Sequence, residues 1–189
     1  MNAIFKIINA AKNEVGYIEK KSNKNLDEKT ANTGAGNYTK YAYDIDKNFS
    51  GFYNGRKNGH PWCDVFFDWL FITTFGVGMA KRMLCQPDNS LGAGCKYSMN
   101  YYKKNDRFYK TAEIGDQIFF YNSDKTNIAH TGLVVYVDEN YVYTIEGNAR
   151  IDGDMTGGRV ANKTYAKNNP LIAGYGRPRY DLVVYNPTV

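Results

Sequence analysis

The 189-residue sequence predicts an α+β fold, with helices in its first part and an antiparallel sheet in its second. Two observations support this. Apolar residues recur at helical spacing near the N-terminus and form a dense run after residue 61. Beyond residue 112, segments rich in β-branched and aromatic residues are separated by turn signals. Because helices and strands are segregated rather than alternating, α+β is favoured over α/β.

The first expected helix covers residues 3–16 and ends at Gly16. Its apolar positions follow helical spacing: Ile4, Ile7, Ile8, Ala11 and Val15. Residues 20–60 are polar and rich in Asn, Lys, Gly and Tyr, so we expect irregular structure there, with at most short helical turns. Pro61 favours a first helical turn. The apolar run after it predicts a buried helix over residues 62–75, and shorter helices are expected at 78–84 and 97–105.

The second part of the chain predicts strands bounded by turn residues. They are expected at residues 116–121, 130–138, 141–147, 158–165 and 171–177. We expect one domain over residues 1–180. Residues 181–189 are then a C-terminal tail, a last strand or the start of a linker.

The net charge of +5 and the pI of about 8.9 favour association with polyanions, which include nucleic acid and the anionic polymers of bacterial walls. Lysines are scattered, as on a solvated surface. The 17 tyrosines suit packing on a sheet better than a stacking groove. Polar residues interrupt the apolar start, so neither a signal peptide nor a membrane span is predicted. We expect a product made in the cytoplasm that needs another route to any target outside.

Three cysteines are present. Cys85 and Cys95 flank a short loop and could form a disulfide, but a cytosolic origin favours free thiols. A metal site at these two is disfavoured because there is no C-x-x-C pair and only two histidines are available. Cys63 differs, since a helix start lowers a thiol pKa and offers unpaired N–H groups to an oxyanion. A small buried hydrophobe is an equally good interpretation of its position alone.

His130 begins a predicted strand, and Gly132 two residues later leaves room for a general base. If residues 129–138 and 141–147 form a hairpin, His130 lies near Glu146 or Asn148. A carboxylate there fixes the tautomer of the imidazole and stabilises its charged form. Side-chain alternation puts Asn148 on the same strand face as Glu146. Taken alone, Glu146 is better interpreted as a solvated charge at a strand end. The ordered set of Cys, His and acid, however, indicates a catalytic site more specifically than any one of the three residues.

Four segments in this order carry a resemblance: PWCDVFFDW, GDQIFF, AHTGLVV and TIEGN. Together they resemble the CHAP family of cysteine, histidine-dependent amidohydrolases/peptidases, within the papain-like superfamily. Residues 37–63 resemble the version in phage and prophage endolysins of Gram-positive bacteria. The resemblance covers roughly residues 3–180. It implies a papain-like fold and hydrolysis, through a thioester, of an amide in the peptide part of peptidoglycan. The bond is that of an N-acetylmuramoyl-L-alanine amidase or of an endopeptidase.

The resemblance also assigns roles to residues. It implies Cys63 as nucleophile, His130 as base, and Glu146 and Asn148 as residues that orient the imidazole or line the site. Substrate binding is assigned to Trp62, Tyr53 and Thr131. Papain has a Gln before its Cys, whereas residues 54–58 contain none, which leaves the oxyanion donors open beyond the Cys63 N–H. Some family members bind calcium before the Cys, and the alternating oxygen donors here are Asp44, Asp46 and Asn48.

No cofactor is expected to be required, with calcium as the one candidate. The expected partner is peptidoglycan, without nucleic acid or membrane insertion, and the chain is expected to be a monomer that reaches the wall after holin-type export or lysis. Two alternatives remain. One is an inactive wall-binding module on the same scaffold. The other is a CHAP-like effector amidase that acts on an amide outside the wall.

Overall fold

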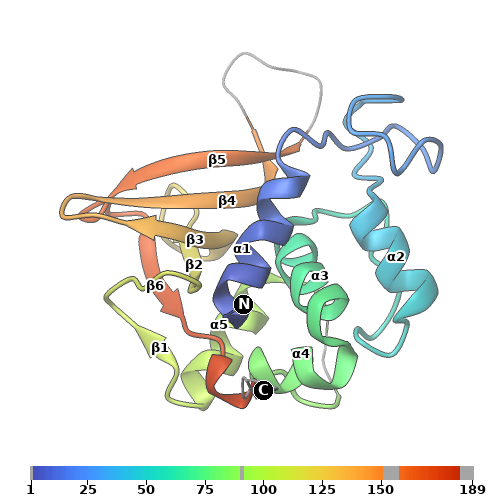
Figure 1. Cartoon of the computed structure of the whole chain (residues 1–189). Helices are drawn as coiled ribbons and strands as arrows, with labels where there is room; N and C mark the ends of the chain where they lie inside the picture. Colours follow the sequence, from blue (N-terminus) through green and yellow to red (C-terminus); the bar gives the residue numbers. More distant parts are fainter. Residues whose placement is uncertain (1, 90–91, 151–157, 184–189) are drawn as a thin grey trace.

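The computed structural model describes residues 2–89, 92–150 and 158–183. It is an α+β structure, as predicted, with the helices before the main strands (Figure 1). The α-helices are α1 (Ala3–Glu14), α2 (Lys40–Asn48), α3 (Cys63–Phe75), α4 (Val77–Met83) and α5 (Cys95–Lys104). The strands are β1 (Phe108–Tyr109), β2 (Gln117–Tyr121), β3 (Ile128–Val137), β4 (Tyr141–Ala149), β5 (Arg159–Ala166) and β6 (Ile172–Gly176).

The six strands form one sheet in the order β1-β6-β2-β3-β4-β5, and every neighbouring pair is antiparallel. The predicted hairpin of β3 and β4 is confirmed, with Leu133 opposite Ile145 and Val137 opposite Val142. Because side chains alternate along a strand, Leu133 and Ile145, which lie opposite each other, both face the helices. The opposite face carries a smaller apolar cluster that includes Val134 and Val142.

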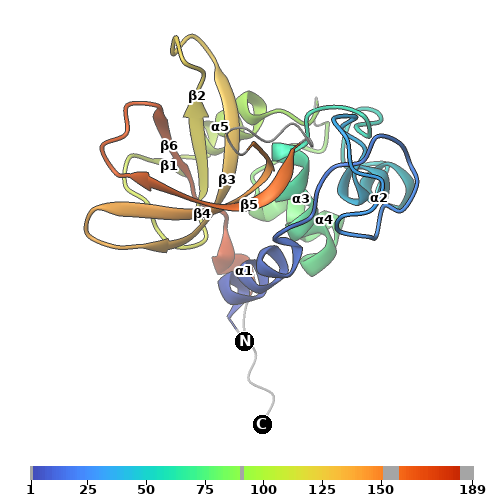
Figure 2. The ribbon, with the colours of Figure 1, turned by 90° about the horizontal axis from the view of Figure 1, so that it is seen from above.

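Helix α3 is the centre of the structure and lies between the sheet and α2 (Figures 1 and 2). It is apolar on all sides, and nine of its thirteen residues are buried, which is the pattern of a helix surrounded by protein. The helix predicted over residues 62–75 is therefore confirmed, with a start one residue later. Trp62 is the N-cap residue, so Pro61 lies before the first turn rather than in it. Gly76, at φ 80°, ends the helix.

The prediction of irregular structure with at most short helical turns over residues 20–60 is wrong for residues 40–48, which form the nine-residue helix α2. Thr39 caps the helix by accepting a hydrogen bond from the Ala42 N–H at 3.1 Å. Tyr41 and Ile45, four residues apart, bury one face of α2. The Tyr41 hydroxyl donates to the Glu14 carboxylate at 2.8 Å, which ties α2 to the end of α1.

The other predicted elements are present with small boundary shifts, and the two-residue strand β1 was not predicted. Tyr180–Leu182 form a short 3-10 helix instead of a last strand, and the Tyr180 hydroxyl donates to the Gly115 carbonyl at 2.9 Å. Residues 184–189 of the predicted tail lie outside the described residues. Among the described residues, no helix combines the length and the apolar character that crossing a membrane requires.

Candidate active site

Cys63 is the first residue of α3 and lies at the helix N-terminus, as predicted. The first helical bond runs from the Phe66 N–H to the Trp62 carbonyl at 2.9 Å, so the N–H groups of residues 63–65 have no backbone partner within the helix. No side chain caps this end. The Cys63 side chain is 8% exposed. A thiol and the backbone N–H groups of a helix N-terminus therefore meet at one point, and the Asp64 N–H hydrogen-bonds to the Cys63 sulfur.

His130, on β3, lies beside both Cys63 and an acid. Its Nε2 atom is 2.8 Å from Oε2 of Glu146, on β4. The Nδ1 atom is then the ring nitrogen that remains for the thiol, and His130 hydrogen-bonds with Cys63. Glu146 is 1% exposed and accepts two further hydrogen bonds, from the Thr144 hydroxyl at 2.6 Å and the Tyr165 hydroxyl at 3.2 Å. The carboxylate is thus held in one position, with an oxygen aimed at the imidazole.

Gly132 makes room for this carboxylate. A Cβ atom on Gly132 would lie 2.5 Å from Cγ of Glu146. The two residues face each other across β3 and β4, on the sheet face away from α3. Gly132 was expected to leave room for His130. In the structure it leaves room for Glu146, the carboxylate that is hydrogen-bonded to His130.

The pKa values of this pair are shifted in opposite directions. A hydrogen bond from Cys95, together with one from His130 and the imidazolium charge, holds the pKa of the Cys63 thiol well below its usual range, although burial raises it. Burial lowers the pKa of His130, but hydrogen bonds to Cys63 and Glu146 outweigh it and raise the pKa to about 10. Both shifts favour a thiolate–imidazolium pair, and the thiolate is the form in which a cysteine attacks.

Two residues of the site were not predicted, and both connect α3 with α5. The Cys95 sulfur lies 3.5 Å from the Cys63 sulfur. Asp64 is buried and accepts hydrogen bonds from the Gly94 N–H at 2.8 Å, the Ser98 hydroxyl at 2.8 Å and the Gln117 amide at 3.0 Å. Burial and the neighbouring thiolate raise the pKa of Asp64 to about 6. The position of Asp64 directly after Cys63 was the one feature of the sequence that could have identified it as part of the site, and no such feature identified Cys95.

The three residues assigned to substrate binding are buried, so that assignment is wrong. Trp62 is fully buried, and its indole N–H donates to Glu19 at 2.8 Å. The Tyr53 hydroxyl donates to Asp68 at 2.6 Å beneath the site, and the Thr131 hydroxyl donates to the Ile118 carbonyl at 2.7 Å. Each side chain supports the surroundings of Cys63 or His130 from inside and leaves no surface for a substrate.

Asn148 does not continue the strand alternation that was expected of it. Its φ is 54°, in the left-handed region, and the pairing of β4 with β5 shifts between Glu146 and Ala149. A Cβ atom on Gly158 would collide with Oδ1 of Asn148, so the amide lies over the start of β5. The predicted role of Asn148 beside the imidazole therefore has no contact in its favour among the described residues.

The proposed calcium ligands do not form a loop. Asp44, Asp46 and Asn48 all lie on α2, where residues two apart point to nearly opposite sides. Asp44 accepts from the Asn48 amide at 2.6 Å and from the Trp69 indole at 2.8 Å. The Asp46 carboxylate instead accepts from the backbone N–H groups of residues 57 and 58, at 2.8 and 3.0 Å. Across the described part of the chain, no group of three or more His, Cys, Asp or Glu side chains is placed to hold a metal ion.

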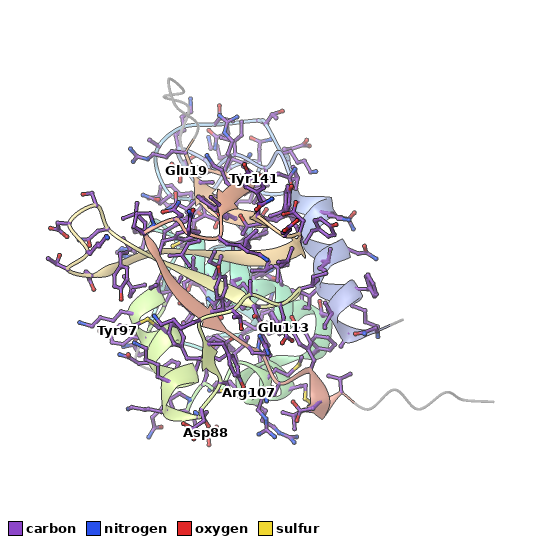
Figure 3. All side chains as sticks on the ribbon, turned by 90° about the vertical axis from the view of Figure 1, so that its left-hand side faces the viewer. Glu19, Asp88, Tyr97, Arg107, Glu113 and Tyr141 are labelled. Atoms are coloured by element: carbon purple, nitrogen blue, oxygen red, sulfur yellow. The ribbon has the colours of Figure 1, made fainter. Side chains whose placement is uncertain are left out.

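A pocket of about 560 Å³ opens over Cys63. One wall carries the cationic and polar side chains of residues 54–60, among them Arg56 and Lys57, and another carries Cys95 and Tyr97. Tyr97 is 43% exposed on the outer side of α5, as Figure 3 shows. A larger pocket of about 670 Å³ lies between α2 and residues 23–28, and it contains none of the candidate catalytic residues. We take the pocket at the thiol as the site because the nucleophile and the helix N-terminus line it.

No protein-family model, curated protein or solved structure matches the chain. The assignment of a function therefore depends on the residues and their geometry.

Proposed function

We propose that the protein is a cysteine amidohydrolase/peptidase that cleaves an amide bond in the peptide part of Gram-positive peptidoglycan. Cys63 is the nucleophile, His130 the general acid and base, and Glu146 the positioning residue for His130. One observation carries the proposal: the imidazole lies beside a helix-end thiol and its other nitrogen is 2.8 Å from a buried carboxylate. A structural ion pair needs neither the pocket over the sulfur nor the helix N-terminus at the thiol.

The reaction follows from these positions. The Cys63 thiolate attacks the carbonyl carbon, and the oxyanion accepts hydrogen bonds from the N–H groups that open α3. His130 gives its proton to the nitrogen of the leaving amine, and a thioester remains on Cys63. The now neutral imidazole takes a proton from water, which attacks the thioester and releases the acid. Glu146 stabilises the imidazolium in both halves of the cycle.

The substrate class rests on three features. The four segments around Cys63, Gln117, His130 and Glu146 resemble CHAP sequences, whose members act on peptidoglycan. Arg56 and Lys57 on the pocket wall suit the free carboxylates of a wall peptide. The net charge of +5 suits anionic wall polymers. The finer fold we propose is the papain-like CHAP fold, since the nucleophile starts the central helix and the base lies on the sheet. We further propose a monomer that needs no cofactor and reaches the wall after release from the cell.

The test is the release of new amino groups from purified Gram-positive walls. The native chain should release new amino groups, and Cys63→Ala should release none. Cys85→Ser, a control change at a cysteine outside the pocket, should leave the rate unchanged. Full activity in Cys63→Ala would end the proposal. Mass spectrometry of the fragments then separates an amidase, which frees the amine of L-alanine, from an endopeptidase. Activity only on amides outside the wall would favour the effector alternative.

A further inference from the structure

Two cysteines 32 positions apart in the chain meet at the active site. Cys63 starts α3 and Cys95 starts α5, and both side chains line the same pocket. Their sulfur atoms are 3.5 Å apart, and both thiols are free. Asp64 fixes this approach, because its carboxylate accepts hydrogen bonds from the Gly94 N–H and the Ser98 hydroxyl at the start of α5. The helix ends, and not only the side chains, are held together.

The two thiols have complementary states. Hydrogen bonding from Cys95 and from His130 lowers the pKa of Cys63, and the same contact together with burial raises the pKa of Cys95 well above its usual range. The shifts thus favour a thiolate at Cys63, which lines the pocket, and a protonated thiol at Cys95 within contact distance. This is the arrangement in which an oxidised cysteine is captured by a resolving cysteine.

We propose that Cys63 and Cys95 are a reversible oxidation site, which a peroxide converts to a disulfide that switches the enzyme off. The Cys63 thiolate attacks one peroxide oxygen, the O–O bond breaks, and Cys63 becomes a sulfenic acid while hydroxide leaves. The Cys95 sulfur then attacks the Cys63 sulfur. The S–S bond forms, the S–O bond breaks, and a second hydroxide leaves. With the protons of both thiols, the products are one disulfide and two waters for each hydrogen peroxide.

The movement required is small. A disulfide has an S–S bond of about 2.05 Å, so the sulfurs must approach by about 1.5 Å. The linkage removes the thiolate, and so the nucleophile, without unfolding the site. A dithiol reductant restores it by thiol–disulfide exchange. Cys85 follows α4 and lines a different pocket with Lys81 and Arg179, so it is not the resolving residue.

The experiment reads the linkage by mass, independently of activity. The native protein is treated with one equivalent of hydrogen peroxide, and its intact mass and its peptides after non-reducing digestion are measured. The expected product has lost two hydrogen atoms and contains a peptide pair joined through Cys63 and Cys95. Cys85→Ser should form the same pair. Cys95→Ser and Cys95→Ala should form none and should instead gain oxygen at Cys63. Addition of oxygen to Cys63 in the native chain without linkage, or linkage through Cys85, would overturn the proposal.

The loss of activity on oxidation rests on the proposed function, whereas the formation of the Cys63–Cys95 disulfide does not. Wall hydrolysis should fall at least about tenfold as the linked form accumulates and return with dithiothreitol. In Cys95→Ser, peroxide should abolish activity without recovery once Cys63 passes beyond sulfenic acid. If the pair forms and hydrolysis continues, Cys63 is not the nucleophile, and the switch and the proposed function both fail while the linkage stands. If hydrolysis depends on Cys63 and no pair forms, the function stands and the oxidation site fails.

Discussion

Gly132→Ala is the sharpest test of the carboxylate as a positioning group, because it moves Glu146 without changing any catalytic residue. The new Cβ would lie 2.5 Å from Cγ and 3.3 Å from Cδ of the buried glutamate. Ordinary contact needs about 3.4 Å, so Cγ must move by about 0.9 Å in a closely packed interior. The distance from Glu146 to Nε2 of His130, now 2.8 Å, then approaches or exceeds the limit of a hydrogen bond, about 3.2 Å.

The magnitude follows from that hydrogen bond. A hydrogen bond to a charged group contributes roughly 1.5–3 kcal/mol, which corresponds to a loss of roughly 10- to 150-fold in kcat/KM. The methyl group also overpacks the interior and lowers the free energy of unfolding by roughly 1–3 kcal/mol. The assay is the initial rate of amino-group release from walls, at a temperature where denaturant titration shows the variant to be folded.

The control separates the two effects. Gly176→Ala places a Cβ against the ring of Tyr102, away from the three catalytic residues, and overpacks the interior in the same way. It should lose stability and keep its rate. Gly78→Ala, with open space around the new Cβ, should change neither. If folded Gly132→Ala hydrolyses walls at the native rate, the carboxylate does not position the imidazole, and the role given to Glu146 is wrong.

Four further outcomes are expected. The pKa of Cys63 is lowered and that of His130 is raised to about 10, so the rate at which iodoacetamide alkylates Cys63 should be fast and nearly constant from about pH 7 to about pH 9. In His130→Ala this rate should instead rise with pH. A rate that rises with pH in the native protein would contradict the ion pair. The stability that His130 contributes is fully present below about pH 6.5 and is lost as pH rises through about 10, as denaturant titrations at several pH values will show. Trp62→Phe removes the indole N–H that donates to the buried Glu19 carboxylate, and it should lower the free energy of unfolding in urea by roughly 1–3 kcal/mol. An unchanged unfolding midpoint would show that this hydrogen bond does not stabilise the fold. Asp64→Asn puts an amide N–H donor among three donors and should lower the free energy of unfolding by a similar amount in urea, and an unchanged midpoint would contradict the role given to Asp64.

The sequence predicted the elements that carry the candidate site because each left a local signal. The apolar run after Pro61 has no polar face, so it could only be a buried helix, and its start is where the structure has Cys63. The short turn between β3 and β4 fixed the pairing closely enough to put His130 near Glu146. A one-residue shift between Val134 and Tyr136 changes the register in the half of the hairpin that carries the site, but it is small enough to keep His130 near Glu146.

The failures have a common physical cause, which is that tertiary contacts decided the outcome. The apolar face of α2 consists of a few residues within a polar segment, and the contacts of Tyr41 with Glu14 and with the rings of α3 stabilise it. Asn148 takes a left-handed conformation that strand alternation cannot foresee. Trp62 was assigned to substrate binding, but its indole N–H reaches Glu19, 43 positions earlier in the chain.

The approach of Cys95 to Cys63 shows how the site balances opposing charges. Two helix N-termini, those of α3 and α5, meet at the thiolate and favour its negative charge. Asp64 lies buried beside the same sulfur and opposes it, since the thiolate contributes to the raised pKa of Asp64. That carboxylate is also the group that binds α5 to α3, through Gly94 and Ser98. A neutral replacement would remove a repulsion from the nucleophile and at the same time release the helix end that carries Cys95. The acid is therefore best understood as the residue that keeps the second thiol in place, with His130 and the helix ends offsetting its charge.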